Sequence, residues 1–272
     1  MSSSKSKKIE RGIKNDQFYT KPSVALTLSD FVKRQPWFND IERVVEPSAG
    51  VGAFSGLFEN CLAFDIEPRA ENIVQADFLA IEVTKGPKTL AIGNPPFGRQ
   101  SSLVIKFFKK CAEFADYIAF ILPKSFEKAS MQNRLPLTHS LIYSELLPSN
   151  SFHVDGMDYD VPSLFQIWNC SPRNKIEIKR DSAYFKWVSK EEGQVAVRRV
   201  GFRAGQVCVG EDYINTCPES HYYLMAERLP SVLACFQSID WTKKSVFTAG
   251  PRSLSKSEIV ELFDLTFPLW DG

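Results

Sequence analysis

The Asn94-Pro95-Pro96-Phe97 segment combines groups that could hold a planar amino group. Each proline fixes its own φ and disfavours a helical conformation in the residue before it, so we expect a stiff bend after the apolar run 90–93. At this bend the side-chain oxygen of Asn94 and the carbonyl of Pro95 would face one point as acceptors. The Phe97 ring could cover the face of a bound heterocycle. The segment therefore predicts a site that holds the amino group of a nucleobase for methylation, with all four residues taking part in catalysis.

A second candidate segment is the loop that follows the expected strand 43–46. Gly50 and Gly52 would let the backbone approach a ligand at the start of a helix that continues to about Asn60. The loop is not a GxGxxG motif and lacks the lysine of a phosphate-binding P-loop. Because it carries Glu46, it suits a cationic ligand better than a phosphate. A glycine loop alone is also typical of a tight turn.

Acidic residues end the next two expected strands, Asp65 in the strand 61–67 and Asp77 in the strand 73–79. An acid at the tip of the second strand of a nucleotide-binding sheet commonly binds ribose hydroxyls. A single such acid is more typical of a turn or a helix cap. With Glu46, however, three successive strand ends carry acids, and this pattern favours a ligand site.

The rest of the N-terminal region alternates between expected helices and strands. Thr20 is expected to cap a helix that has Pro22 in its first turn and continues to about Arg34. The almost wholly apolar run 117–122 indicates a strand buried on both faces, as in a parallel sheet. The pattern predicts an α/β fold with a doubly wound, mostly parallel sheet of seven strands and an antiparallel last pair. The other expected elements are a strand at 89–93, helices at 101–114 and from Ser125 to Arg134, and strands at 139–147 and 163–169 joined by the acidic loop 152–160.

The composition changes after about residue 172. Residues 173–203 contain nine Lys or Arg and four Asp or Glu, interleaved with aromatic residues. Basic and aromatic side chains together suit a nucleic-acid surface, since phosphates attract the charges and bases stack on the rings. We expect Arg198 and Arg199 to contact such a substrate, although a solvated sheet edge explains the pattern about as well. The expected elements are strands at 175–179, 183–188, 194–200 and 206–209 and helices at 221–229 and 256–264, the last capped by Ser255.

Composition limits the class of protein. The chain has 272 residues, 44% hydrophobic content and a net charge of +1, which gives no general attraction to polyanions. Its apolar runs are too short to cross a bilayer, and its first residues do not form a secretory signal. The six cysteines form no CxxC pair, so we expect a cytoplasmic protein with reduced thiols and no metal site. We divide the chain into a basic arm (1–16), a catalytic domain (17–171) and a small β-rich appendage (172–272).

Residues from about 18 to 169 resemble the amino-group class of S-adenosylmethionine-dependent methyltransferases, above all the adenine-specific DNA methyltransferases. The resemblance implies a Rossmann-like class I methyltransferase fold, S-adenosylmethionine as cofactor, and nucleic acid as partner, with DNA favoured over RNA. A base within a duplex would have to be flipped out to reach the site. The matching segments are 18–22, 46–52, 65–68, 76–79 and 94–97.

The resemblance also implies a role for each matched residue. Tyr19, Thr20 and Pro22 would contact the methionine end of the cofactor, and Glu46 would lie near its sulfonium or amino group. The other implied cofactor residues are Pro47, Ser48, Ala49, Gly50 and Gly52 in the loop, Asp65 on the ribose hydroxyls, Ile66 on the adenine face, Asp77 on the adenine amino group, Phe78 against the ring, and Asn94.

On the target side, Asn94 and Pro95 would hold the amine while Phe97 stacks on the base. Phe126 belongs to a later and weaker motif of the family. A second stacking aromatic is expected beyond the sixth strand, and the unranked candidates are Phe152, Phe165 and Trp168.

The Asn94–Phe97 bend fits any planar NH₂ group, so it predicts the reaction better than the substrate. The principal prediction is adenine in DNA, and a base amino group in RNA is the second. A glutamine amide in a protein is the third, and an inactive scaffold with the same fold is the non-enzymatic alternative. Recognition sequence, strandedness, oligomeric state and biological role stay open.

Overall fold

The computed structural model describes residues 18–154, 156–248 and 251–270. The chain divides into two compact units, Met1–Ile176 and Glu177–Gly272. The expected basic arm at 1–16 lies outside the described residues.

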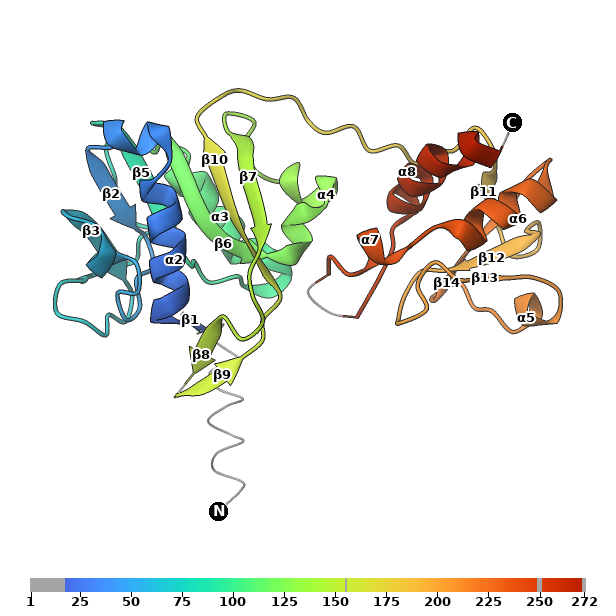
Figure 1. The fold of residues 1–272 in the computed structure, drawn as a ribbon, viewed down its shortest axis with the longest axis horizontal. Helices are drawn as coiled ribbons and strands as arrows, with labels where there is room; N and C mark the ends of the chain where they lie inside the picture. Colours follow the sequence, from blue (N-terminus) through green and yellow to red (C-terminus); the bar gives the residue numbers. More distant parts are fainter. Residues whose placement is uncertain (1–17, 155, 249–250, 271–272) are drawn as a thin grey trace, which may run out of the picture. The chain divides into compact units, whose positions relative to one another are not determined.

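The first unit is built on a seven-stranded sheet in the order β4-β3-β2-β5-β6-β10-β7 (Figure 1). Its neighbouring strands are parallel, except that β10 runs antiparallel to both β6 and β7. The chain builds one half of the sheet outward from β2 and then returns to build the other half from β5, which is doubly wound topology. The predicted Rossmann-like fold with a doubly wound, mostly parallel sheet of seven strands is therefore confirmed. The strands are β2 (Arg43–Glu46), β3 (Cys61–Asp65), β4 (Val74–Gln75), β5 (Thr89–Gly93), β6 (Tyr117–Pro123), β7 (Ser140–Leu146) and β10 (Ser163–Asn169).

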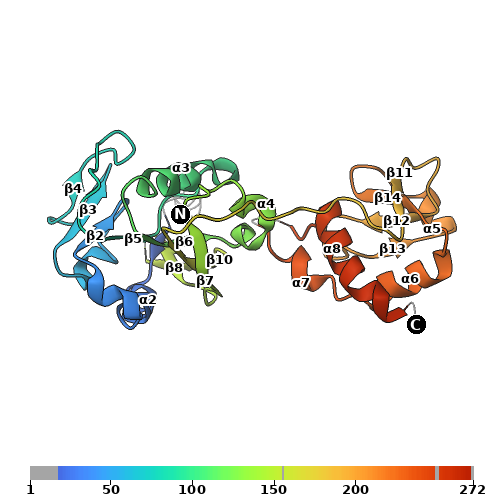
Figure 2. The ribbon, with the colours of Figure 1, turned by 90° about the horizontal axis from the view of Figure 1, so that it is seen from above.

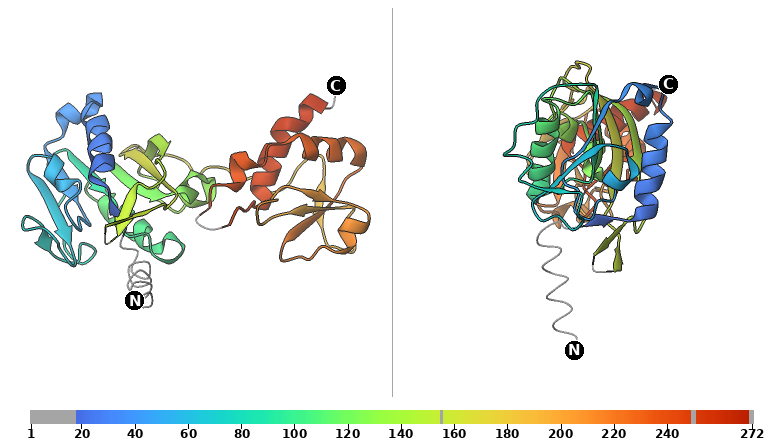
Figure 3. Two further views of the ribbon diagram at one scale, coloured as in Figure 1. Left: turned by 60° about the horizontal axis from the view of Figure 1, so that its bottom comes forward. Right: turned by 90° about the vertical axis from the view of Figure 1, so that its left-hand side faces the viewer.

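Two longer helices cover opposite faces of this sheet, α2 (Pro22–Lys33) and α3 (Ser102–Cys111) (Figures 2 and 3). The α2 side packs through Ala25, Leu28 and Val32 against buried strand residues. The α3 side packs through Phe107, Phe108 and their neighbours against the other face. Strand β5 is buried along its whole length, and β6 and β10 almost so, which explains their continuous apolar sequences. The shorter helical elements of this unit are η1 (Pro36–Asp40), η2 (Ser55–Leu57), η3 (Arg99–Ser101), η4 (Lys124–Glu127) and α4 (Ala129–Gln132).

A small second sheet joins the N-terminal segment to a hairpin. Strand β1 (Tyr19–Thr20) pairs antiparallel with β8 (Phe152–Val154), which pairs with β9 (Met157–Tyr159). The backbone N–H of Lys21 continues the pairing by donating to the Ser151 carbonyl at 3.0 Å. The expected loop at 152–160 is thus a hairpin that holds the start of the described chain.

Four predictions for this unit are wrong in detail. Thr20 lies in β1, and the N-cap of α2 is Lys21 without a side-chain bond. No α-helix follows the glycine loop, because Gly50 and Gly52 adopt positive φ and the chain continues through turns into the single 3-10 turn η2. The third strand is shortened to the two residues of β4, and the expected helix from Ser125 is divided between η4 and α4.

The second unit is a four-stranded antiparallel sheet in the order β11-β14-β12-β13. Helices α6 (Leu229–Ser238) and α8 (Lys256–Thr266) share a hydrophobic core with it. As predicted, Ser255 caps α8, and together with Glu258 it forms a capping box. The helix expected at 221–229 is wrong, since this segment is the central strand β14, and 175–179 forms no strand. The remaining elements are β11 (Lys186–Val188), β12 (Val195–Arg198), β13 (Val207–Cys208), β14 (His221–Met225), α5 (Glu211–Ile214), α7 (Thr242–Ser245) and η5 (Phe267–Trp270).

Among the described residues, no helix has both the length and the apolar character that crossing a bilayer requires.

Candidate active site

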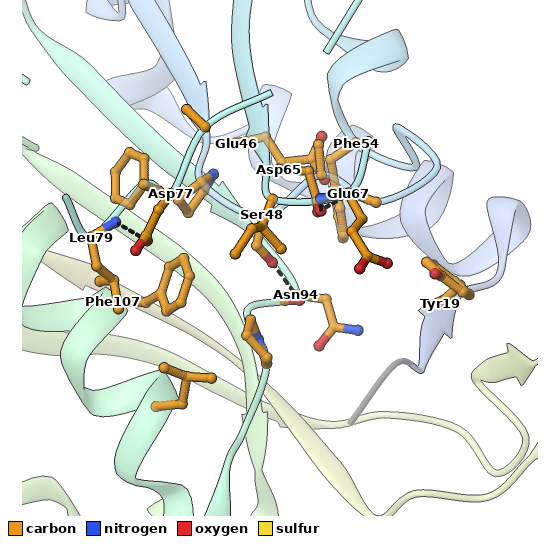
Figure 4. Close-up of a pocket in the computed structure, with 18 of the residues that line it drawn as sticks. Tyr19, Glu46, Ser48, Phe54, Asp65, Glu67, Asp77, Leu79, Asn94 and Phe107 are labelled. Carbon is orange, nitrogen blue, oxygen red and sulfur yellow. Dashed lines mark hydrogen bonds between the residues drawn. The ribbon is translucent and has the colours of Figure 1, made fainter. Parts of the chain in front are cut away.

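A pocket of about 500 Å³ opens at the carboxyl ends of the first unit's central strands. Its walls come from β1, the loop after β2, the ends of β3 and β5, and the segment after β4 (Figure 4). In doubly wound sheets this edge is where ligands bind. The predicted site residues that line the pocket are Tyr19, Thr20, Glu46, Pro47, Ser48, Ala49, Gly50, Asp65, Ile66, Asp77, Phe78, Asn94 and Pro96.

Four of the predicted catalytic and cofactor-binding residues do not line this pocket. Pro22 is exposed in the first turn of α2, and Gly52 shapes the loop by donating its N–H to the Ala49 carbonyl at 2.7 Å. Pro95 is buried, and Phe97 packs between the two hydrophobic clusters of this unit.

The orientation of the Asn94 amide follows from its hydrogen bond to Phe18, the residue just before strand β1. The amide nitrogen Nδ2 donates to the backbone carbonyl of Phe18 at 2.9 Å. Because a carbonyl can only accept, the NH₂ group must face Phe18, and the oxygen Oδ1 faces the opposite way. The hydroxyl of Ser48 also donates to the Asn94 backbone carbonyl at 3.3 Å. Asn94 therefore offers an oriented acceptor at the pocket (Figure 4).

Asp65 stabilises the glycine loop as well as facing the pocket. Its Oδ2 accepts from the Gly50 N–H at 2.7 Å, and its Oδ1 accepts from the Glu67 N–H at 2.8 Å. A carboxylate offers about four acceptor positions, so these two bonds leave capacity for two hydroxyl donors. The exposed Glu67 lines the same part of the pocket. This corner is therefore suited to a diol.

Another part of the pocket lining combines apolar surfaces with one acid. Ile66 is 66% exposed, which is unusual for its type and leaves an apolar side chain open to a ligand. Phe78 and Phe107 lie parallel with ring centroids 5.9 Å apart. Asp77 accepts from the Leu79 N–H at 3.0 Å, which fixes its carboxylate at the pocket wall. Such a set could hold a flat aromatic ring that carries an amino group.

Glu46 is an acid enclosed at the base of the pocket, with only 1% of its surface exposed. Its Oε2 accepts from the Ser55 N–H at 2.7 Å. Burial disfavours the charged form and raises the pKa of Glu46 to about 8, although the bond from Ser55 opposes this. A cation bound beside it would favour the carboxylate.

Strand β1 closes one wall of the pocket. The Tyr19 ring lies so close to the glycine loop that a Cβ at Gly50 would meet its Cε1 at 2.8 Å. The Arg69 guanidinium lies 5.3 Å from the centre of the same ring. The Thr20 hydroxyl is buried and has no hydrogen-bond partner among the described residues. A buried hydroxyl without a partner is costly, so Thr20 has a hydrogen-bonding capacity that a polar group of a ligand could satisfy.

The predicted second stacking aromatic is not found in an accessible position. Phe126, Phe152, Phe165 and Trp168 are all fully buried and packed into the two cores of the first unit. None of these rings presents a face to a ligand, because neighbouring side chains enclose them. Arg198 and Arg199 lie in the second unit, at and just after β12.

Several lining residues were not among the predicted ones. Glu67 was foreseeable as the second acid of the 65–68 segment, and Phe107 belongs to the apolar face of α3. The others depend on how the chain folds around the pocket, and they are Phe18, Phe54, Ala76, Leu79 and Leu103. Within the described residues, no group of three His, Cys, Asp or Glu side chains could hold a metal ion.

Solved structures similar to this chain share little sequence with it. A Listeria monocytogenes protein assigned to the class I S-adenosylmethionine-dependent methyltransferases is 11% identical, with a TM-score of 0.44 over 60% of this chain and 64% of that one, so the match spans less than two thirds of its length. A proposed RNA methyltransferase from Pyrococcus horikoshii is 14% identical, with a TM-score of 0.41 over 54% and 83% of the two chains. The 23S rRNA methyltransferase ErmE is 14% identical, with a TM-score of 0.39 over 58% and 72%. No protein-family model and no curated protein matches the sequence.

Proposed function

We propose that this protein transfers a methyl group from S-adenosylmethionine to the exocyclic amino group of adenine in DNA. The observation that carries the proposal is the orientation of Asn94, whose amide nitrogen is bound to Phe18 so that its oxygen is left to accept from a target amine. This acceptor adjoins a pocket whose donors and acceptors suit the cofactor part by part.

The residues of the pocket fit S-adenosylmethionine in chemical character. Glu46 would balance the positive charge of the methionine end, and the unpartnered Thr20 hydroxyl would bond to its polar groups. Asp65 would accept from the ribose hydroxyls. Ile66 and Phe78 would contact the adenine ring while Asp77 accepts from its amino group. When bound, the cofactor supplies a methyl group on a sulfonium, which is a strong electrophile.

The chain's own contribution to the reaction is alignment of the target amine. An aromatic amine is a weak nucleophile, since its lone pair is delocalised into the ring. Asn94 Oδ1, which is oriented at the pocket, would accept one of its hydrogens and help to localise the lone pair toward the methyl group. A fixed acceptor also stabilises the positive charge that develops on the nitrogen during transfer.

The choice of DNA adenine rests on the 18–22 segment and on the basic and aromatic character of the second unit. The Asn94 corner itself would accept any planar NH₂ group. A base amino group in RNA and a glutamine amide in a protein are therefore competing substrates, and the experiment must separate all three.

The test incubates the full chain with S-adenosylmethionine labelled in its methyl group and with separate pools of unmethylated DNA, RNA and protein. Digestion of each pool then identifies the labelled nucleoside or residue. Label in N6-methyladenine from DNA is the expected result. Label confined to RNA or protein would overturn the substrate, and no label in any pool, despite cofactor binding, would overturn the activity.

A further inference from the structure

The loop 201–205 of the second unit presents a phenylalanine to solvent. Phe202 is 83% exposed, the highest value of any large hydrophobic side chain in the described part of the chain. An isolated exposed apolar residue needs no explanation. Phe202 differs in two respects. Backbone hydrogen bonds hold the loop beneath it, and two arginines adjoin it, Arg252 at its ring and Arg203 next in the chain.

Backbone hydrogen bonds hold this loop at both ends. Gly201 donates to the Arg252 carbonyl at 2.8 Å, and Gly205 donates to the Arg198 carbonyl at 2.7 Å. Gly205 adopts a φ of +98°, and a Cβ there would lie 2.1 Å from the Trp241 ring. That ring is itself fixed by a bond from its Nε1 to the Phe236 carbonyl at 3.1 Å. The position of Phe202 is therefore set by a loop that only glycine can close.

One face of the Phe202 ring is backed by a cation. The Arg252 guanidinium carbon lies 4.8 Å from the ring centre. Arginine over an aromatic face is a stabilising arrangement that also orients the ring. With one face on Arg252 and 83% of the side chain exposed, the other face is open to a flat partner.

Arginines adjoin Phe202 in the sequence as well as at its ring. The segment 193–210 contains three arginines and no acidic residue, and Glu211 and Asp212 follow directly after it. Arg203, next to Phe202, is exposed. The Nε of Arg199 is buried and has no acceptor among the described residues, and its guanidinium lies 5.0 Å from the Tyr222 ring centre. An anionic partner is therefore favoured over an apolar or cationic one.

We propose that Phe202 is a stacking platform for an unpaired base of single-stranded nucleic acid, with Arg203 contacting the adjacent phosphate. A base in a duplex is stacked on its neighbours and offers no free face, whereas a single strand can place a base on the open face of Phe202. The inference extends the proposed function, since it assumes only that the partner is nucleic acid and specifies its strand state.

The test measures binding of the full chain to a fluorescent oligothymidine single strand, by anisotropy and over a series of salt concentrations. Thymine has no exocyclic amine, so this binding requires neither cofactor nor methyl transfer, and it can succeed or fail independently of the activity test. Phe202→Ala should weaken binding about fivefold or more at every salt concentration, because stacking on an aromatic side chain is only weakly salt-dependent. Arg203→Gln should reduce the slope of log K against log salt by about 0.7, the value for one phosphate on a single strand.

Leu265→Ala is the matched control, since Leu265 is 71% exposed in α8 of the same unit and has no aromatic face. It should bind as the unaltered chain does, and all variants should keep their cofactor affinity. Wild-type affinity of Phe202→Ala for oligothymidine would overturn the proposal. So would an equal loss of affinity for a mixed-sequence duplex, or a change in oligomeric state by light scattering, which would assign the ring to contact with a second copy.

Discussion

The bend at Asn94 and the loop at Phe202 both position a single side chain, but the surroundings of the two side chains differ. Each places one side chain by fixing the backbone around it. At Asn94 the side chain is itself bonded, to Phe18, and faces an enclosed pocket. At Phe202 the backbone is fixed through Gly201 and Gly205, but the side chain extends into solvent with only Arg252 behind it.

The difference matches the two kinds of partner. Aligning a reacting amine requires an acceptor whose direction is fixed before the substrate arrives. Stacking on a base requires a flat surface, and small rotations of either ring cost little. Altering the first site should therefore affect the rate of transfer, whereas altering the second should affect binding. The predictions below test this separation, beginning with the largest effect.

Asn94→Ala should reduce methyl transfer by a factor of about 10² to 10³, the range seen when one preorganised polar contact to a transition state is removed. Cofactor binding, measured by calorimetry, should change little, because the other polar residues of the pocket remain. Asn133→Ala is the control, since within the described residues its side chain bonds the backbone of Ile176 alone and does not line the pocket. Transfer by Asn94→Ala at the rate of the control would show that the corner is not catalytic.

Gly205→Ala should lower the free energy of unfolding of the second unit by about 3 kcal/mol, from positive φ and from overlap with Trp241. Gly201→Ala should cost only about 1 kcal/mol, since its φ of +89° is strained for alanine but no atom lies within 4 Å of the new Cβ. Hydrogen exchange in residues 177–272 of the full chain would measure both. An equal loss of unfolding free energy in the two variants would mean that the loop shifts to relieve the overlap with Trp241. Such a shift would contradict a rigid platform.

Cofactor affinity should rise by up to about tenfold per pH unit between pH 6 and 8 and then level off. Glu46 is neutral below its raised pKa of about 8, and a bound cation favours its ionised form, so binding releases a proton in this range. Calorimetry in two buffers of different ionisation enthalpy would detect the proton. Glu46→Gln should bind more weakly at pH 8 and lose the dependence. Oligothymidine binding should not change with Glu46→Gln, and a parallel change would link the two sites.

The sheet was largely predictable from sequence, because strands that are buried on both faces appear in the sequence as continuous apolar runs. The apolar runs in β5, β6 and β10 favour buried strands over other secondary structure, and β10 (Ser163–Asn169) has the predicted bounds. The absence of an α-helix after the glycine loop was not predictable in the same way. The Ser55 N–H, which a helix there would have left unpaired in its first turn, is bound by the Glu46 carboxylate instead. This contact depends on tertiary structure, as does the pairing that makes 221–225 a strand.

The residues of the candidate site also differ in whether local sequence or tertiary structure determines their place in it. Residues in short contiguous segments, such as 46–50 and 65–66, were identified as a set because their spacing is local. The fully buried Phe126, Phe152 and Trp168 were misjudged, since sequence shows that a ring is present but not which neighbours enclose it. Phe202 was overlooked for the converse reason, because its exposure depends on the fold of the 201–205 loop.

The bond from Asn94 to the Phe18 carbonyl makes the direction of the Asn94 amide depend on the residue just before β1, a strand only two residues long. Such a strand is the part of a domain that separates most easily from its partner. If residues 18–20 detached from β8, whether by proteolytic trimming, a bulky fusion or competition from another peptide, the amide would lose its anchor while the seven-stranded sheet stayed intact. An inactive preparation of this protein could then be fully folded by every bulk spectroscopic measure.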